Sequence, residues 1–314
     1  MRIASHALLA LLWCVVAGAQ AATAVPVYTS TGPDDHHVLV LGRISDDPKA
    51  HYKQLRPLLD YVVPRMADVG IREGRILMAR DAQQMTSYLR RGRVDWVTET
   101  SGTAMLLRTR AGARPLLLTE RGGVALYHSV FFARRDSGID SLADLRGRSI
   151  AFQSIGSTSA YFVPAALMLG QGLQLEILLS PLDRPTPESV GYVFARSELN
   201  VAAWVHKGLV DAGVVSSQDW EDPRRVPLSF HPDLAIIHRS GDYPRAVEMM
   251  RASLDPRVEA RLREVLLQAE HDPAGRKAMQ AFFGTSRFLP LDADSARDLE
   301  RVRDAVTRVR EQME

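Results

Sequence analysis

The strongest chemical signal in the sequence is a run of three adjacent hydroxyl side chains: Ser157, Thr158 and Ser159. The run follows Gly156 and the short apolar segment Ser149–Gln153, which predicts a strand, and it precedes an apolar segment that predicts a helix from Tyr161. The first amides of a helix have no partner within it and carry partial positive charge. With hydroxyls added and a glycine that lets a ligand approach the backbone, this turn favours binding of an anion.

A simpler role for this segment is helix capping. A serine just before a helix often accepts a hydrogen bond from one of its first amides, so Ser157 or Ser159 could serve only as a cap. The strand–turn–helix order and the three adjacent hydroxyls favour the anion site over capping alone. We therefore expect Ser157, Thr158 and Ser159 to contact a ligand oxyanion.

Strands and helices alternate along the chain after residue 36. The predicted strands are His37–Ile44, Arg75–Ala79, Val94–Val97, Pro115–Thr119, Val124–Arg134, Ser149–Gln153, Gln174–Leu179, Val190–Phe194, Val210–Val215 and Leu234–His238. Most of the segments between these strands have apolar residues at helical spacing. The same spacing predicts two further helices, Arg257–Ala269 and Ser295–Gln312. This alternation predicts an α/β fold with mostly parallel sheets.

Two of the predicted strands divide the chain into two α/β lobes. Val124–Arg134 is long enough to leave one lobe and enter another, and Leu234–His238 is a candidate for the return. We expect a discontinuous first lobe at 37–126 and 232–314, a second lobe at 133–225, and approximate crossings at 127–132 and 226–231. Because clefts between lobes are common ligand sites, the hydroxyl run of the second lobe would face such a cleft.

The N-terminus reads as an export signal. Arg2 precedes an apolar core at 7–18, and Ala19 and Ala21 are the small residues that a signal peptidase recognises, so residues 1–21 predict a cleaved signal peptide. Residues 22–36 follow as a polar arm. Cys14, the chain's single cysteine, lies inside the signal after the bulky Trp13, which disfavours a lipid anchor there and leaves no thiol in the mature protein. We expect a periplasmic protein.

Composition and motifs exclude several classes of protein. The net charge of +2, with basic and acidic residues interleaved, argues against nucleic-acid binding. The sequence has no nucleophile elbow, phosphate-binding P-loop or zinc-protease motif, and the pair His36-His37 is a weak candidate for a metal site. We expect no catalytic residues, no metal, no cofactor and a monomer.

Five segments, in this order, carry a resemblance to a known family: Tyr127–Ser129, Arg135–Ile139, Ser141–Gly147, Gly156–Ser159 and Gly208–Gly213. Together they resemble the phosphate, phosphite and phosphonate-binding proteins of ABC importers. The resemblance covers about residues 37–290 and is densest between 127 and 213.

The resemblance implies a type II periplasmic-binding fold that closes around a small oxyanion and delivers it to an ABC permease. In that family the hydroxyl run would bind phosphoryl oxygens, with Tyr127 and Ser129 of the crossing strand and the aromatic Tyr161 nearby. Glu99 and Thr100, in a loop after the predicted strand Val94–Val97, would face them from the first lobe. The alternative for that loop is helix capping by Thr100 or Ser101.

Departures from the family pattern leave the ligand open. Ser154-Ile155 stands where members often have Asp-Pro, and Glu198 stands where they often have histidine. A carboxylate beside an anionic ligand is repulsive unless it meets an ammonium or a P–OH proton, so Glu99 and Glu198 in the cleft would favour an aminoalkylphosphonate. The alternative is that Glu198 forms a surface ion pair. For His128, packing on the crossing strand is favoured over ligand contact.

Two other functions remain open from the sequence. The same two-lobed clamp could be a periplasmic sensing module that acts on a membrane histidine kinase or cyclase. A phosphoester-processing enzyme is disfavoured, because no general base has an evident partner near the hydroxyl run and no metal site is evident.

Overall fold

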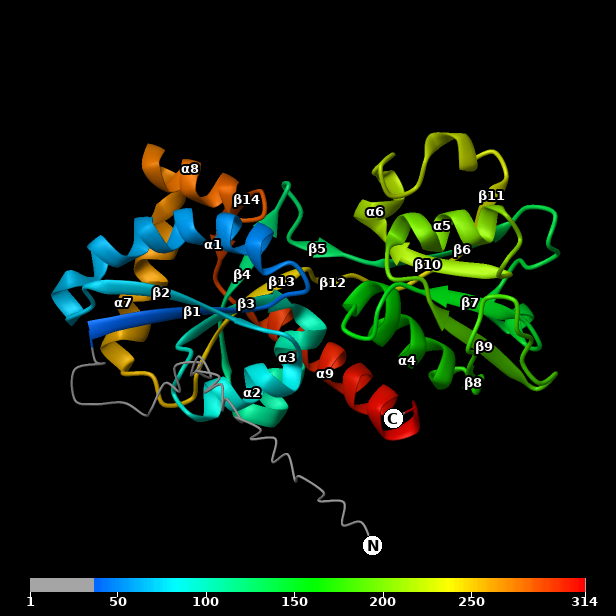
Figure 1. The fold of residues 1–314 in the computed structure, drawn as a ribbon, viewed down its shortest axis with the longest axis horizontal. Coiled ribbons are helices and arrows are strands. Elements are labelled where there is room, and N and C mark those ends of the chain that lie inside the picture. The colour runs from blue at the N-terminus through cyan, green and yellow to red at the C-terminus, as the bar shows by residue number, and fades with distance from the viewer. Residues whose placement is uncertain (1–36, 314) are drawn as a thin grey trace, which may run out of the picture. The chain divides into compact units, whose positions relative to one another are not determined.

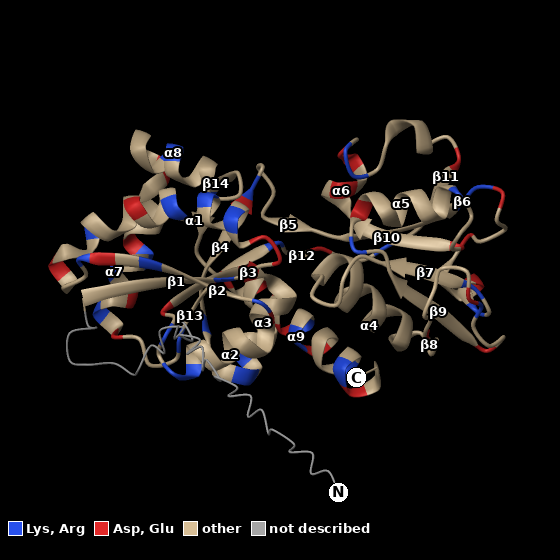
Figure 2. Ribbon diagram, viewed as in Figure 1, with Lys and Arg blue, Asp and Glu red and all other residues tan. Residues whose placement is uncertain are grey.

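The computed structural model describes residues 37–313, which form two six-stranded sheets and the helices that cover them (Figure 1). The predicted signal peptide with Cys14, and the predicted arm at 22–36, lie outside the described residues. None of the described helices is long and apolar enough to cross a membrane. Figure 2 shows basic and acidic residues mixed over the helices of both sheets, including α9 (Ala293–Met313), in agreement with the small net charge.

The first sheet has the order β14-β4-β13-β3-β1-β2. Its strands are β1 (Val38–Ile44), β2 (Glu73–Ala79), β3 (Trp96–Thr100), β4 (Arg114–Arg121), β13 (Ala246–Met250) and β14 (Thr285–Leu289). β1 is parallel to β2 and β3, whereas β13 is antiparallel to both β3 and β4. The carboxyl ends of β1, β3 and β4 therefore lie at one edge of the sheet, where ligands of open α/β sheets usually bind.

The second sheet has the order β11-β6-β10-β7-β9-β8. Its strands are β6 (Ser129–Arg134), β7 (Ser149–Phe152), β8 (Gln174–Ile177), β9 (Ser189–Phe194), β10 (Ala212–Ser216) and β11 (Leu234–Arg239). β7 to β10 are mutually parallel along this order, whereas β6 is antiparallel to both its neighbours, β10 and β11. The α/β class with mostly parallel strands is as predicted.

Helices lie on both faces of each sheet. Those of the first lobe are α1 (Pro48–Val62), η2 (Val63–Val69), α2 (Ala82–Arg90), α3 (Ser101–Ala111), α7 (Pro256–Gln268), η6 (Ala269–His271) and α8 (Pro273–Ala281). Those of the second lobe are η3 (Leu142–Leu145), η4 (Thr158–Phe162), α4 (Val163–Gly170), α5 (Glu198–His206), α6 (Ser217–Glu221) and η5 (Leu228–Phe230). Buried apolar residues of α1, α7 and α8 form one core on the first sheet, and those of α2 and α3 belong to the core on its other face.

The connection between the sheets is a short antiparallel pair, β5 (Leu126–Tyr127) with β12 (Tyr243–Pro244). The predicted long strand Val124–Arg134 is interrupted at His128, after which β6 joins the second sheet. The candidate return strand also differs from expectation, because β11 pairs with β6 inside the second sheet and the chain returns only at β12. The boundaries of the two lobes stay predictions.

The C-terminal helix α9 packs against helices of both lobes and against the connection between the sheets. It contacts α3, α4 and β12, and its apolar stripe is buried as predicted: Leu299, Val302, Val306 and Val309. These side chains share one core with α3 and α4. α9 therefore stabilises the region in which the predicted site lies.

Candidate functional site

The hydroxyl run begins a helix, as its sequence predicts, but the first turn is wider than an α-helix. η4 is a π-helical turn that continues directly into α4. The Ser157 hydroxyl accepts the amide of Ala160 at 3.1 Å, so this serine is a cap. Thr158 and Ser159 are buried, with 1% and 7% of their surface exposed.

Thr158 contacts the start of another helix. Its hydroxyl oxygen accepts the amide of Gly102 in the first turn of α3 at 2.9 Å, and the Thr103 hydroxyl donates to the Gly156 carbonyl at 3.4 Å. Thr100, the N-cap residue of α3, makes no side-chain capping bond. The positive ends of two helices, one from each lobe, therefore meet at Thr158.

Tyr127 joins the same group of hydroxyls from the connection between the sheets. Burial raises the pKa of its phenol, the charge of Arg245 opposes that rise, and side-chain hydrogen bonding with Ser159 and Thr158 opposes it further. The Arg245 guanidinium lies 5.6 Å from the centre of the Tyr127 ring. Thr158, Ser159 and Tyr127, all expected to contact the ligand, are thus brought together.

Ser129 and Tyr161 lie in other surroundings. The Ser129 hydroxyl is fully buried and bonded to the Tyr243 hydroxyl at 2.7 Å. The Tyr161 ring packs in the second-lobe core, 5.1 Å from the Phe194 ring centre to centre. His128 contacts Asp242, with 3.0 Å between Nδ1 and the carboxylate oxygen. These positions favour structural roles for the three side chains.

The expected loop at Thr98–Ser101 is wrong, because Thr98 to Thr100 belong to β3 and Ser101 begins α3. The strand extends this far because β13 pairs with it along its whole length. Glu99, 4% exposed, accepts the amide of Ile44 at 2.9 Å and lies 3.5 Å from Arg43. Its carboxylate already has a protein cation beside it.

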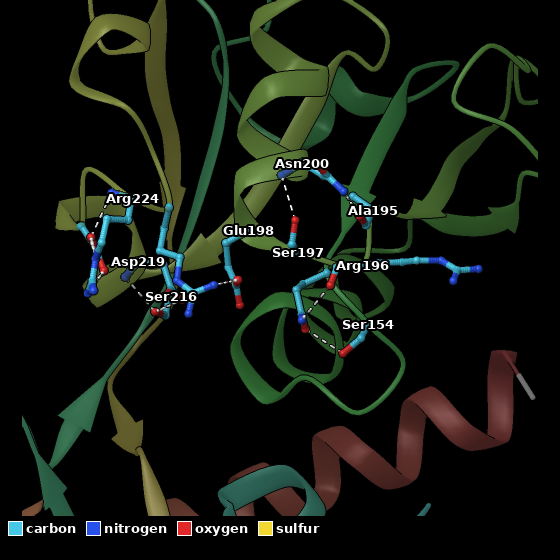
Figure 3. A network of polar contacts seen from close by, with 12 residues as sticks. Ser154, Ala195, Arg196, Ser197, Glu198, Asn200, Ser216, Asp219 and Arg224 are labelled. Carbon is cyan, nitrogen blue, oxygen red and sulfur yellow. Dashed lines mark hydrogen bonds and ion pairs between the residues drawn. The ribbon is translucent and has the colours of Figure 1, made fainter. Parts of the chain in front are cut away.

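Glu198 also has a protein partner. It begins α5, and its carboxylate accepts a hydrogen bond from Arg225 at 3.0 Å. Figure 3 shows it near Ser216 and Asp219, at the carboxyl end of β10. Burial, and secondly the charge of Asp219, raise the pKa of Glu198. Because Glu99 and Glu198 both face arginines of the chain, neither requires a ligand ammonium group.

The shifted pKa of Glu198 predicts a pH-dependent stability. A carboxyl group that binds its proton more tightly in the folded state favours folding below its unfolded pKa, near 4.5, and loses that contribution as pH rises through the folded value. Glu198→Gln should therefore raise the melting temperature at pH 7, with the gain disappearing toward pH 4.5. Thermal unfolding at both pH values measures this, with the exposed Glu221→Gln as control. A lower melting temperature at pH 7 would show that the Arg225 contact outweighs the burial.

Three arginines that the sequence analysis did not single out surround the same region: Arg43, Arg121 and Arg245. Arg43 and Arg121 stand at the carboxyl ends of β1 and β4. Arg43 donates to the Thr98 carbonyl at 2.8 Å and Arg121 to the Thr98 hydroxyl at 3.0 Å. The sequence places both arginines at the ends of strands. Only the sheet order shows that these ends lie on the edge where β3 meets α3, which is where ligands usually bind.

The site is rich in hydroxyl groups, helix starts and cations. Within residues 37–313, no group of three or more His, Cys, Asp or Glu side chains is placed to hold a metal.

The model of one protein family, the periplasmic phosphonate substrate-binding proteins of ABC transporters, matches residues 42–296. The chain belongs to this family. Its members are substrate-binding proteins, not enzymes, and they act in the periplasm with an ABC permease.

Several solved structures are similar to this chain. XAC2383 from Xanthomonas citri bound to chloride ion is 56% identical, with a TM-score of 0.84 over 88% of this chain and 99% of that chain. The same protein bound to ATP gives 55% identity and a TM-score of 0.85 over 88% and 100%. PhnD1 from Prochlorococcus marinus (MIT 9301) in complex with methylphosphonate is 18% identical, with a TM-score of 0.61 over 86% and 98%, and shares the fold. The present chain therefore has the type II periplasmic-binding fold that the sequence predicts.

Proposed function

We propose that this protein captures a small phosphate-bearing anion, such as phosphate, phosphite or a phosphonate, and delivers it to an ABC permease. The ligand would be held where η4 meets the start of α3, and closing of the two lobes would surround it. The observation that carries the proposal is the contact between Gly102 and Thr158, which brings two helix starts together.

The electrostatics of this contact support an anion. A helix N-terminus carries the equivalent of about half a positive charge, so two that meet repel each other unless a negative charge lies near them. First-turn amides are also hydrogen-bond donors suited to phosphoryl oxygens. Here the amide of Gly102 donates to Thr158 and that of Ala160 to Ser157, so a ligand oxygen would take the place of a hydroxyl or bind beside it. The hydroxyls of Ser159 and Tyr127 add donors at the same place, and Arg245 adds a full charge beside the Tyr127 ring.

The relatives support the same class of ligand. XAC2383 has been solved with chloride and with ATP, and both are anions. At more than half identity over most of both chains, a shared preference for anions is a reasonable inference for this chain. The protein partners of the two carboxylates, Glu99 with Arg43 and Glu198 with Arg225, argue against a ligand chosen for its ammonium group.

A thermal-shift screen tests the proposal. Phosphate, phosphite, methylphosphonate, 2-aminoethylphosphonate and sulfate would each be added to the protein at equal ionic strength. A ligand present at 100 times its Kd stabilises the folded state by about 2.7 kcal/mol, so at least one of the phosphorus oxyanions should raise the melting temperature by several degrees. Sulfate serves as the control for a nonspecific anion effect. No shift with any phosphorus oxyanion would contradict the proposal.

A further inference from the structure

On the side of the site formed by the first lobe, two arginine side chains, Arg43 and Arg121, lie against one aromatic ring. We propose that Arg43 and Arg121 form a second anion subsite beside the hydroxyl run, so that the preferred ligand has two anionic groups, as a diphosphate or diphosphonate has. This rests on the proposed function, because the first group would still bind at η4. Phe283, which contacts both guanidinium groups, would fix their positions.

Arg121 is a buried cation with unused hydrogen-bonding capacity. It is 6% exposed, and among residues 37–313 its Nε and that of Arg43 are buried nitrogens without a hydrogen-bond partner. A buried charged group is costly unless it is paired and its donors are satisfied. An anionic ligand group would meet both needs at once.

Phe283 places the two cations against one aromatic ring. The guanidinium carbons of Arg43 and Arg121 lie 4.8 Å and 4.6 Å from the ring centre. Phe283 has a φ of 54°, in the left-handed region that a bulky residue seldom adopts. Such a conformation persists only where the surrounding structure holds it, and it is often found at functional sites.

The acidic groups near the three arginines already have protein partners. Glu99 lies 3.5 Å from Arg43. The Glu248 carboxylate accepts hydrogen bonds from the side chains of Trp96, Thr98 and Thr119, and burial raises its pKa. On the second lobe, the Asp219 carboxylate is hydrogen-bonded by the Ser216 hydroxyl. Within the described part of the chain, these contacts leave the Nε atoms of Arg43 and Arg121 without an acceptor.

The arginines also repel one another. Burial first, and then the charges of Arg43 and Arg245, lower the pKa of Arg121 to about 9. This value is above neutral pH, so Arg121 stays charged in the folded protein and the repulsion persists. A second anionic group on the ligand would relieve it, whereas a ligand ammonium group would increase it.

A series of side-chain contacts links the proposed subsite to the hydroxyl run. Gln218 of α6 donates to the Arg121 carbonyl at 3.5 Å and accepts a hydrogen bond from Arg245. Arg245 in turn lies on the ring of Tyr127, which interacts with Ser159 and Thr158. We propose that one ligand with two neighbouring anionic groups contacts both parts.

Calorimetric titration of phosphate, methylphosphonate, 2-aminoethylphosphonate and diphosphate tests the inference. Diphosphate should bind at least about tenfold more tightly than phosphate, and Arg121→Met or Arg43→Met should weaken diphosphate binding by about 100-fold while changing phosphate binding by less than about threefold. Arg65→Met is the matched control, because Arg65 also stacks on a ring, that of Tyr61 at 3.8 Å, and pairs with Asp272. It should leave both affinities unchanged.

The thermal stability of the ligand-free variants separates a binding role from a structural one. Arg121 is a desolvated cation repelled by two others, and its side chain donates to a neutral hydroxyl, that of Thr98, so Arg121→Met without ligand should unfold at the same temperature as the wild type or higher. A lower melting temperature would mark Arg121 as structural and overturn the inference. Equal binding of phosphate and diphosphate, or equal loss of both in the arginine variants, would overturn it and leave the proposed function standing. Failure of every anion to bind the wild type would contradict both.

Discussion

Replacing Thr158 and Ser159 together by alanine should weaken binding of phosphorus oxyanions by about 2–4 kcal/mol, since a hydrogen bond to a charged group contributes about 1.5–3 kcal/mol and Thr158 already has one protein partner. The double variant removes two of the hydroxyls that meet at Tyr127 but keeps the backbone amides. Calorimetric titration with the ligand selected by the thermal-shift screen measures the loss.

Ser141→Ala provides the control for this variant. Ser141 is the N-cap residue of η3 and forms a capping box with Asp144. Its replacement should lower the free energy of unfolding by about 1 kcal/mol, as loss of other helix caps does, without changing the affinity for the ligand. An affinity of the double variant equal to that of the wild type would show that the hydroxyl run does not bind the ligand.

Gly102→Val should lower affinity for the same ligand by about 100-fold or more, because the added side chain would keep apart groups that must approach each other to hold the anion. A Cβ at residue 102 would lie 2.8 Å from the Thr158 hydroxyl oxygen and 3.0 Å from a ring carbon of Phe162. Both distances are shorter than ordinary contacts. The start of α3 would therefore move away from η4.

A matched substitution at Gly241 separates this effect from added bulk in general. A Cβ at residue 241 would have open space around it, so Gly241→Val should leave affinity close to that of the wild type. Gly102→Ala should give an intermediate loss. Wild-type affinity in Gly102→Val would mean that the contact between η4 and α3 is not needed for binding.

The regular elements were predictable because local periodicity determines them. The alternating and continuous apolar runs of β1, β7 and β9, and the stripe of α9, lie within one or two residues of their predicted positions. β13 was missed because Glu248 interrupts its apolar run. That side chain is buried only through bonds to Trp96, Thr98 and Thr119, which lie more than 100 residues away in sequence.

Part of the site was predictable because it depends on a local sequence pattern. The hydroxyl run is a local pattern, so its position at a helix start was found, and the resemblance pointed to Tyr127. Arg121 occurs in a polar turn that looks exposed in sequence, and it becomes buried through Thr98 and Phe283, which are distant along the chain. The contact of Gly102 with Thr158 likewise depends on the tertiary fold.

Hydrogen exchange measured with and without the selected ligand shows whether the anion binds where η4 meets the start of α3. Saturating ligand should slow exchange of the amides at 157–162 and at 100–103 together, while the distant helix α8 is unaffected. Protection confined to other segments, or protection of only one of these two, would contradict it.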